Sequence, residues 1–356
     1  MIHHQYIDEL TQLPICALRY TLIAEDEGRL FGDLTPTLRG AIGWALSEIG
    51  CLGECQWSRP ISNQGRSSKI RSKSAASPKH CDIDKCPYER TFNGGGWPKR
   101  GLRILPQGYR LLAPIYSSPH SYLPGEEVSF TLYLFGEASH YAPLWTQAII
   151  KAAAKGIGDQ PRRFHLAEAI DLHTQEALYE RCEPYPPRLA SRLPIAHLID
   201  LPPASLLWSD LGIRVRLQRP WVIRKVGQRP ALSQFCRANL RRSHAMYNRY
   251  FKSIEHPLHG DEIDFFSQAI QHGQLKVHTQ KRYSSTAQRS IPQTGLIGDC
   301  LYTQIQSPDW VYKTLCLGAY LGIGQQANMG LGACDVELVD LSHDHEKVLA
   351  HTTAYS

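Results

Sequence analysis

Several features that would place the chain in a membrane or outside the cell are missing from its 356 residues. No apolar run reaches the roughly 18 residues that a transmembrane helix needs. The first residues, MIHHQYIDEL, have neither the basic start nor the apolar core of a signal peptide. We therefore expect a cytoplasmic protein without a membrane partner, in which disulfide bonds are disfavoured.

Acidic residues are missing from three long tracts, although the net charge is only +6. Residues 211–254 contain eleven Arg or Lys, residues 265–298 contain four and residues 56–80 contain six, and none of these tracts has an Asp or Glu. A solvated surface normally mixes both signs, so the tracts favour an anionic partner, and nucleic acid is the leading candidate. A membrane-binding surface would need an amphipathic helix with bulky apolar anchors, and none stands out.

The spacing of apolar residues predicts the same order of elements twice. Strands are expected at 14–24, 101–115, 127–135 and 164–170, with helices at 35–49 and 141–155. After a Pro-rich connection, strands are expected at 211–218, 275–282, 294–305 and 333–339, with helices at 231–254 and 310–321. Two βαββαβ units predict an α+β protein with two ferredoxin-like (RRM-like) domains in tandem. The expected boundaries are an N-terminal domain at 1–183 with a Cys-rich basic insert at 51–100, a linker at 184–209, a C-terminal domain at 210–342 and a tail at 343–356.

Four cysteines flank the basic, Ser-rich part of the insert in the spacing C-x3-C-x25-C-x4-C. They are Cys51, Cys55, Cys81 and Cys86. Four thiolates in two close pairs suit a tetrahedral, structural zinc ion, and we expect one here. The alternative is four unrelated buried thiols, since free cysteine is common in protein cores. The remaining cysteines, at 16, 182, 236, 300, 316 and 334, are scattered and are expected in the core.

The most informative stretch of the sequence runs from 281 to 332. A basic, hydroxyl-rich segment precedes a glycine-flanked strand, which is followed by a helix and a glycine-rich segment. These parts are Arg282-Tyr283-Ser284-Ser285, Gly295-Leu296-Ile297-Gly298-Asp299, residues 310–321, and residues 322–332 with Gly322, Gly324, Gly330 and Gly332. Glycines let a backbone approach a bulky partner, and successive N–H groups form a concavity that suits a phosphate.

Together these parts resemble the C-terminal domain of the CRISPR precursor-RNA-processing endoribonucleases of the RAMP superfamily. Arg39-Gly40-Ala41 also resembles a segment that RAMP proteins carry in their first helix. The resemblance implies an enzyme that binds CRISPR repeat RNA and cuts it without a catalytic metal. The 2′-hydroxyl would attack, leaving a 2′,3′-cyclic phosphate and a 5′-hydroxyl, and the product could be kept within an effector complex with other subunits. The alternative is a non-catalytic RNA-binding subunit with the same fold; a DNA- or membrane-binding protein would leave the C-terminal block unexplained.

The expected RNA-binding residues lie on the helix at 231–254 and along the C-terminal block. The arginines of that helix have no carboxylate on the helix to pair with, which favours contacts with phosphate over a merely solvated basic face. The full set is Arg237, Arg241, Arg242, Arg249, Arg282, Ser284, Ser285, Arg289, Gly322, Gly324, Gln325, Gln326, Asn328, Gly330 and Gly332.

The catalytic assignment has three alternatives. Cleavage by the 2′-hydroxyl needs a proton acceptor, a proton donor and a cation for the developing charge. In the resembled family a histidine in the first helix or the loop after it commonly supplies part of this, but residues 35–50 contain neither His nor Tyr. The candidates are His80 in the loop after that helix, Arg39 within it, and the group His278, Lys281 and Tyr283.

Overall fold

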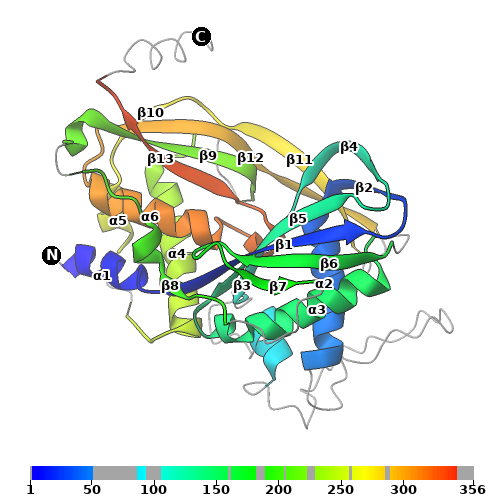
Figure 1. Cartoon of the computed structure of the whole chain (residues 1–356). Helices are drawn as coiled ribbons and strands as arrows, with labels where there is room; N and C mark the ends of the chain where they lie inside the picture. The colour runs from blue at the N-terminus through cyan, green and yellow to red at the C-terminus, as the bar shows by residue number, and fades with distance from the viewer. Residues whose placement is uncertain are drawn as a thin grey trace, which may run out of the picture. The chain divides into compact units, whose positions relative to one another are not determined.

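The computed structural model describes residues 2–50, 86–93, 106–158, 162–181, 189–203, 206–222, 229–255, 259–284 and 289–342. The chain divides into two compact units. The first comprises Met1–Cys16, Arg110–Leu112 and Arg192–Ser356, and the second comprises Ala17–Tyr109 and Ala113–Ser191. The strands of the two larger sheets are labelled in Figure 1. The domain boundaries expected from the sequence stay predictions. Among the described helices, none is long and apolar enough to cross a membrane.

The N-terminal repeat has the strand order of a ferredoxin-like fold. Its sheet runs β3-β5-β1-β6-β7. When β1, β3, β5 and β6 are numbered 1 to 4 in chain order, their order across the sheet is 2-3-1-4, as in ferredoxin-like folds. The strands are β1 (Pro14–Ala24), β3 (Tyr109–Leu112), β5 (Glu127–Phe135), β6 (Phe164–Asp171) and β7 (Ala177–Glu180), and β8 (Leu193–Pro194) pairs with the start of β1. The helices are α2 (Leu34–Gly50) and α3 (Ala142–Lys155), which pack together.

The core of this repeat is aromatic. Trp145 of α3 lies 4.7 Å from Tyr109 and 6.0 Å from Phe92, measured between ring centroids. The Phe92 ring lies so close to α2 that a Cβ at Gly43 would come within 2.2 Å of its Cζ. A glycine in the middle of α2, which costs helix stability, is therefore explained by the close approach of Phe92.

The C-terminal repeat has the same strand order. Its sheet runs β10-β12-β9-β13, and β11 pairs with β12 as a hairpin. Strands β10 and β11 together take the second position, and β9, β12 and β13 are the first, third and fourth strands. The strands are β9 (Leu211–Trp221), β10 (Ile270–His272), β11 (Lys276–Ser284), β12 (Arg289–Thr303) and β13 (Cys334–Asp340). The helices are α4 (Leu232–Tyr250), α5 (Gly260–Phe266) and α6 (Pro308–Leu321), and α4 packs against α6 on one side of the sheet (Figure 1).

Alternation along β9 orients this sheet as the sequence predicts. Ile213, Val215 and Leu217 are buried, whereas Arg216 and Gln218 are exposed. The two βαββαβ repeats, with their antiparallel sheets, confirm the predicted α+β class and the tandem ferredoxin-like architecture.

Several elements were not predicted. They are α1 (Ile2–Leu10), α5, β7, β8, β10 and the two-stranded ribbon formed by β2 (Gly28–Asp33) and β4 (Ile115–Tyr122). The single strand expected over 101–115 is interrupted: within its described residues β3 ends at Leu112, the chain leaves the sheet at Ala113 and Pro114, and Ile115 begins β4. Proline provides no N–H for a ladder, which is consistent with this break.

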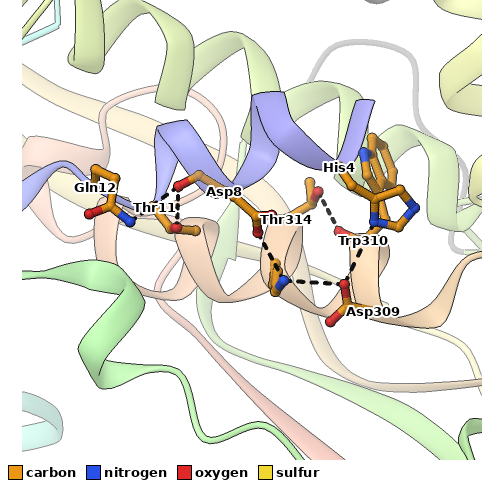
Figure 2. Close-up of polar contacts among 8 residues, drawn as sticks. His4, Asp8, Thr11, Gln12, Asp309, Trp310 and Thr314 are labelled. Atoms are coloured by element: carbon orange, nitrogen blue, oxygen red, sulfur yellow. Dashed lines mark hydrogen bonds and ion pairs between the residues drawn. The ribbon is translucent and has the colours of Figure 1, made fainter. Parts of the chain in front are cut away.

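Helix α1 belongs to the first unit, which also contains the C-terminal repeat, and it lies along α6. Its inner face buries Tyr6, Ile7 and Leu10. The ammonium group of Lys313 lies 2.9 Å from Asp8 of α1 and 3.2 Å from Asp309 of α6. Figure 2 shows these two carboxylates on neighbouring helices. Burial alone would lower the pKa of Lys313, but the hydrogen bonds and charges of the two carboxylates raise it above its ordinary value. Lys313 is thus a protonated link between the two helices.

Candidate nucleic-acid interface

The hairpin of β11 and β12 is a basic two-stranded ribbon. Its register runs from Lys276 opposite Ile297 to Ser284 opposite Arg289, and β9 pairs only with the part of β12 from Leu296 onward. Its exposed residues include three cations and a histidine, namely Lys276, His278, Lys281 and Arg289. No Asp or Glu occurs between 276 and 297 to neutralise them from within the hairpin. This ribbon is therefore an exposed surface that suits a polyanion.

The hairpin separates two of the residues that were grouped for catalysis. Side chains alternate between the faces of a strand, so His278 and Lys281, three residues apart in regular β11, point to opposite faces. Tyr283 and Ser284 pair with Ser290 and Arg289 through their backbones. One catalytic site cannot use His278 and Lys281 together in this conformation. Their individual roles stay predictions.

The glycine-rich segment between α6 and β13 is a tightly packed turn. Gly322, Gly324, Gly330 and Gly332 all have positive φ, between 64° and 80°. A Cβ at Gly332 would lie 1.9 Å from the carbonyl oxygen of Ile323, and one at Gly324 would lie 2.7 Å from Cδ1 of Trp221. Both the backbone conformation and the lack of space therefore demand glycine at these two positions. We call residues 322–332 the glycine loop.

Hydrogen bonds hold the glycine loop against the end of β9. The N–H of Gly332 donates to the carbonyl of Pro220 at 3.0 Å, and that of Gln325 donates to Val222 at 3.3 Å. The side chains of Gln325 and Gln326 are exposed, as RNA contacts would require, whereas Asn328 is only 6% exposed. The burial of Asn328 argues for a role inside the loop, although it was predicted among the RNA-binding residues.

A chain of glutamines joins the hairpin to the glycine loop. Nε2 of Gln280 donates to Oε1 of its cross-strand partner Gln293 at 3.2 Å. Nε2 of Gln293 in turn donates to Oε1 of Gln326 at 2.7 Å. His278 and Arg282 lie two residues before and after Gln280, so all three share one face of β11. Since Gln280 is linked to the glycine loop, this face of the hairpin is the one next to the loop. The hairpin and the loop thus form one continuous surface.

The arginines of α4 are more engaged than the sequence indicated. Arg237 forms a two-pronged ion pair with Asp264 of α5 and donates to the carbonyl of Gly260 at 3.0 Å. Arg242 donates from Nε to the carbonyl of Leu321 at 2.8 Å. Burial, followed by the nearby charge of Arg110, lowers the pKa of Arg242 to about 10. Among the four predicted α4 arginines, Arg241 is the exposed one, while Arg249 is half-buried.

Arg237 and Arg242 thus have partners outside their own helix, which the sequence did not indicate. The absence of acids within α4 is real, but the partners come from other elements: a carboxylate of α5 for Arg237, and a carbonyl at the end of α6 for Arg242. Arg110, which is 1% exposed, donates to the carbonyls of Ala319 and Tyr320, the latter at 2.8 Å. Two cations thus satisfy the last turn of α6, where carbonyls lack helical partners, and so anchor the start of the glycine loop.

The arginines of β9 are also paired. Nη1 of Arg214 lies 2.6 Å from Oε1 of Glu337, and Nε of Arg216 lies 3.0 Å from Oδ1 of Asp299. These pairs neutralise much of the positive charge on the exposed sheet face. An open depression along α1 is lined by His4, Gln5, Asp8, Glu9 and Gln12, and its two carboxylates make it a poor site for an anionic ligand.

Arg39 lies within the aromatic core of the N-terminal repeat. Its Nε donates to the hydroxyl of Tyr109 at 2.8 Å, and its guanidinium lies 4.7 Å from the centre of the Phe92 ring. These contacts give Arg39 a structural role in holding α2 against the sheet, and its catalytic role stays a prediction.

Five predicted site residues lie outside the described residues. They are His80, Ser285, Cys51, Cys55 and Cys81.

A histidine–tyrosine cluster on β4 was missed. The Tyr116 and His120 rings stack with centroids 4.7 Å apart and 10° between their planes, and the Tyr116 hydroxyl is hydrogen-bonded to that of Tyr122. Burial raises the pKa of Tyr122 further above its ordinary value than the contact with Tyr116 does. The even spacing of these three residues in YSSPHSY was the available signal, because residues two and four apart share one face of a strand.

The described residues include only one of the four predicted zinc ligands. Cys86 is buried, and Cys51, Cys55 and Cys81 lie outside the described residues. In the part of the chain that the structure describes, no group of His, Cys, Asp and Glu could hold a metal ion. Cys16, Cys236, Cys300, Cys316 and Cys334 are buried, which confirms their assignment to the core, and Cys182 lies outside the described residues.

Two family models match the sequence. Residues 13–189 match AF_1859_N, an N-terminal domain, and residues 215–334 match the CRISPR-associated endoribonuclease Cas6. The second match includes most of β9, all of α4, the hairpin, α6 and the glycine loop. No curated protein matches the chain.

Solved structures with a similar fold include Cas6 proteins. The product complex of a Cas6 from Thermus thermophilus gives a TM-score of 0.50 at 13% identity, over 91% of this chain and 99% of that chain. A partial Cas6-RT-Cas1–Cas2 complex also gives 0.50 at 13% identity, over 92% of this chain but 46% of that chain. At such low identity these structures show a shared fold, and the family assignment depends on the sequence match.

Proposed function

Because the chain is a Cas6-type CRISPR-associated protein, we propose that it is an endoribonuclease that binds CRISPR repeat RNA and cuts it. The observation that carries the proposal is the family match over 215–334, which includes the basic hairpin and the glycine loop that the glutamine chain joins. A Cas6 of the same fold has been solved with its product.

RNA contacts are proposed for the hairpin, the glycine loop and the exposed part of α4. Lys281 and Arg289 are exposed on the hairpin and have no acidic partner among the described residues. Exposed cations of this kind suit phosphate, and positive-φ glycines bring backbone N–H groups close to a ligand. Arg241 of α4 is the exposed member of the predicted helical set and joins the proposal, whereas Arg237 and Arg242 support the scaffold.

Cleavage is proposed to proceed by attack of the ribose 2′-hydroxyl on the adjacent phosphate. The hydroxyl loses its proton to a base, the bond from phosphorus to the 5′-oxygen breaks, and that oxygen takes up a proton from an acid. The products are a 2′,3′-cyclic phosphate and a 5′-hydroxyl, and no metal enters the balance. Candidates for proton transfer are His80, the hairpin residues His278 and Tyr283, and the exposed His120 beside Tyr116. Arg39 and Lys281 remain candidate cations for the phosphorane charge.

The test uses a repeat RNA and its matched copy with a 2′-deoxy nucleotide at the cut position. We expect the wild type to cut the first in the presence of EDTA, and to bind the second with similar affinity while leaving it intact. The 5′ fragment should resist ligation at its 3′ end until the cyclic phosphate is opened and the remaining phosphate is removed to leave a 3′-hydroxyl. Cleavage of the deoxy substrate, or a strict requirement for added Mg²⁺, would overturn the chemistry.

The second candidate function is a non-catalytic RNA-binding subunit with the same fold. It is favoured by one observation: residues 35–50 of α2 carry neither His nor Tyr. Tight binding of repeat RNA without cleavage, across buffers and metals, would establish this alternative. One solved structure of similar fold is a partial Cas6-RT-Cas1–Cas2 complex, so copurification with other CRISPR-associated proteins from a native host is a matching test of partners.

A further inference from the structure

Gln293 is a buried polar residue at the junction between the hairpin and the glycine loop. It is 4% exposed and uses both ends of its amide, accepting from Gln280 and donating to Gln326. A buried amide needs such partners, because an unsatisfied one is costly. Its two partners lie on different sides of the junction, one in β11 and one in the loop.

Gln326 has an unusual backbone conformation. Its φ is 58° and its ψ is 30°, which is the left-handed region that glycine adopts readily and other residues disfavour. The four other positive-φ residues of the glycine loop are glycines. In this conformation the carbonyl of Gln326 accepts a hydrogen bond from the N–H of Met329 at 2.8 Å, and this bond closes the turn that follows Gln326. A strained, non-glycine position of this kind persists only when surrounding contacts hold it.

We propose that Gln293 is a positioning residue that holds Gln326 in the left-handed conformation and thereby fixes the glycine loop for RNA phosphate. The N–H groups of Gly324 and Gln326 donate to no acceptor among the described residues, so they are available to an anion. Only the part of the proposal that concerns phosphate rests on the proposed function; the conformational part stands on the free protein.

The first arm of the experiment needs no RNA. Gln293→Met keeps the length and bulk of the side chain but removes both hydrogen bonds, and the partners Gln280 and Gln326 are open enough to bond water. Amide hydrogen exchange at Met329 should become about threefold to tenfold faster, the range that corresponds to one net hydrogen bond. Adding Gln326→Gly should reverse the change, because glycine takes this conformation without support.

The second arm measures repeat-RNA affinity for the same proteins. Gln293→Met should weaken binding by about threefold to tenfold, and the Gln293→Met, Gln326→Gly double variant should recover. The matched control is Gln293→Met with Gln325→Gly: Gln325 is also exposed and next in sequence, but its φ is not positive, so it should give no rescue.

Each outcome decides a separate point. Unchanged exchange at Met329 in Gln293→Met overturns the positioning role. Faster exchange with unchanged affinity overturns the link between loop shape and RNA. Failure of Gln326→Gly to restore affinity, when it restores exchange, shows that the Gln326 side chain itself contacts RNA and also overturns the proposal. A wild type that binds no repeat RNA refutes the proposed function, and the exchange arm still decides the conformational role.

Discussion

Replacing Lys281 and Arg289 by Ala should flatten the salt dependence of repeat-RNA binding. Both side chains are exposed on the hairpin, and neither has an acidic partner among the described residues. If each neutralises a phosphate, binding releases the counterions condensed on that phosphate, and losing the contact removes its share of the salt dependence. The perturbation removes two charges without touching a buried group.

The magnitude follows from the contact number. Each phosphate contact contributes about 0.7 to the slope of log K against log salt for single-stranded RNA, and about 0.9 for a duplex. Losing two contacts should reduce the slope by about 1.4 to about 1.8. Between about 50 and about 200 mM salt, the wild type should therefore lose roughly sevenfold to twelvefold more affinity than the variant does.

The assay is a titration of labelled, 2′-deoxy-blocked repeat RNA at four or more salt concentrations. The matched control is Arg214→Ala with Arg216→Ala, which removes the same charge from arginines that pair with Glu337 and Asp299. We expect the control to lower affinity slightly and to keep the wild-type slope. Equal slopes for the hairpin variant and the wild type, or a larger change in the control, would place the RNA on another surface.

Three further predictions concern the scaffold and the insert. Arg110→Met should lower the free energy of unfolding by about 2–3 kcal/mol, measured by urea denaturation, because the carbonyls of Ala319 and Tyr320 lose a charged donor. Gly332→Ala should cost about 2 kcal/mol or more by the same measurement, whereas Gly40→Ala in α2, which has open space and an ordinary φ, should be neutral or stabilising. If Cys51, Cys55, Cys81 and Cys86 bind zinc, elemental analysis should find about one zinc per chain, reduced by Cys86→Ser; folded protein without zinc would rule the site out.

Regular, amphipathic elements were predictable because their signal lies within a few neighbouring residues. The alternation of Ile213, Val215 and Leu217 with Arg216 and Gln218 identified β9 and its buried face. Helix α1 carries a short amphipathic signal, with Tyr6, Ile7 and Leu10 on one face, but it was missed. Nine residues make a weak signal, and the polar contacts of this helix are with distant partners: Lys313 for Asp8 and Tyr247 for Glu9. The ribbon of β2 and β4 was missed for a related reason, because a short strand is defined by the strand it pairs with.

Charge was harder to interpret than hydrophobicity. The acid-free tract from 211 to 254 was taken as an anion-binding signal, yet three of its arginines pair with acids outside the tract, at Glu337, Asp299 and Asp264. Sequence separation says little about spatial separation in a sheet whose neighbouring strands, β9 and β13, are far apart in the chain. Strand periodicity, by contrast, would have separated His278 from Lys281, which were predicted as members of one catalytic group.

Neutralisation of those arginines sharpens the functional assignment. When the paired arginines of β9 and α4 are set aside, the exposed cations without a partner among the described residues include Lys281 and Arg289 on the hairpin and Arg241 on α4. The hairpin is also the element that Gln293 connects to the glycine loop. A surface that combines mobile side-chain charge with fixed backbone donors can attract RNA at long range and then orient one phosphate at short range. For this reason the hairpin cations should govern the salt dependence of binding, whereas Gln293 should affect affinity at every salt concentration by a similar factor.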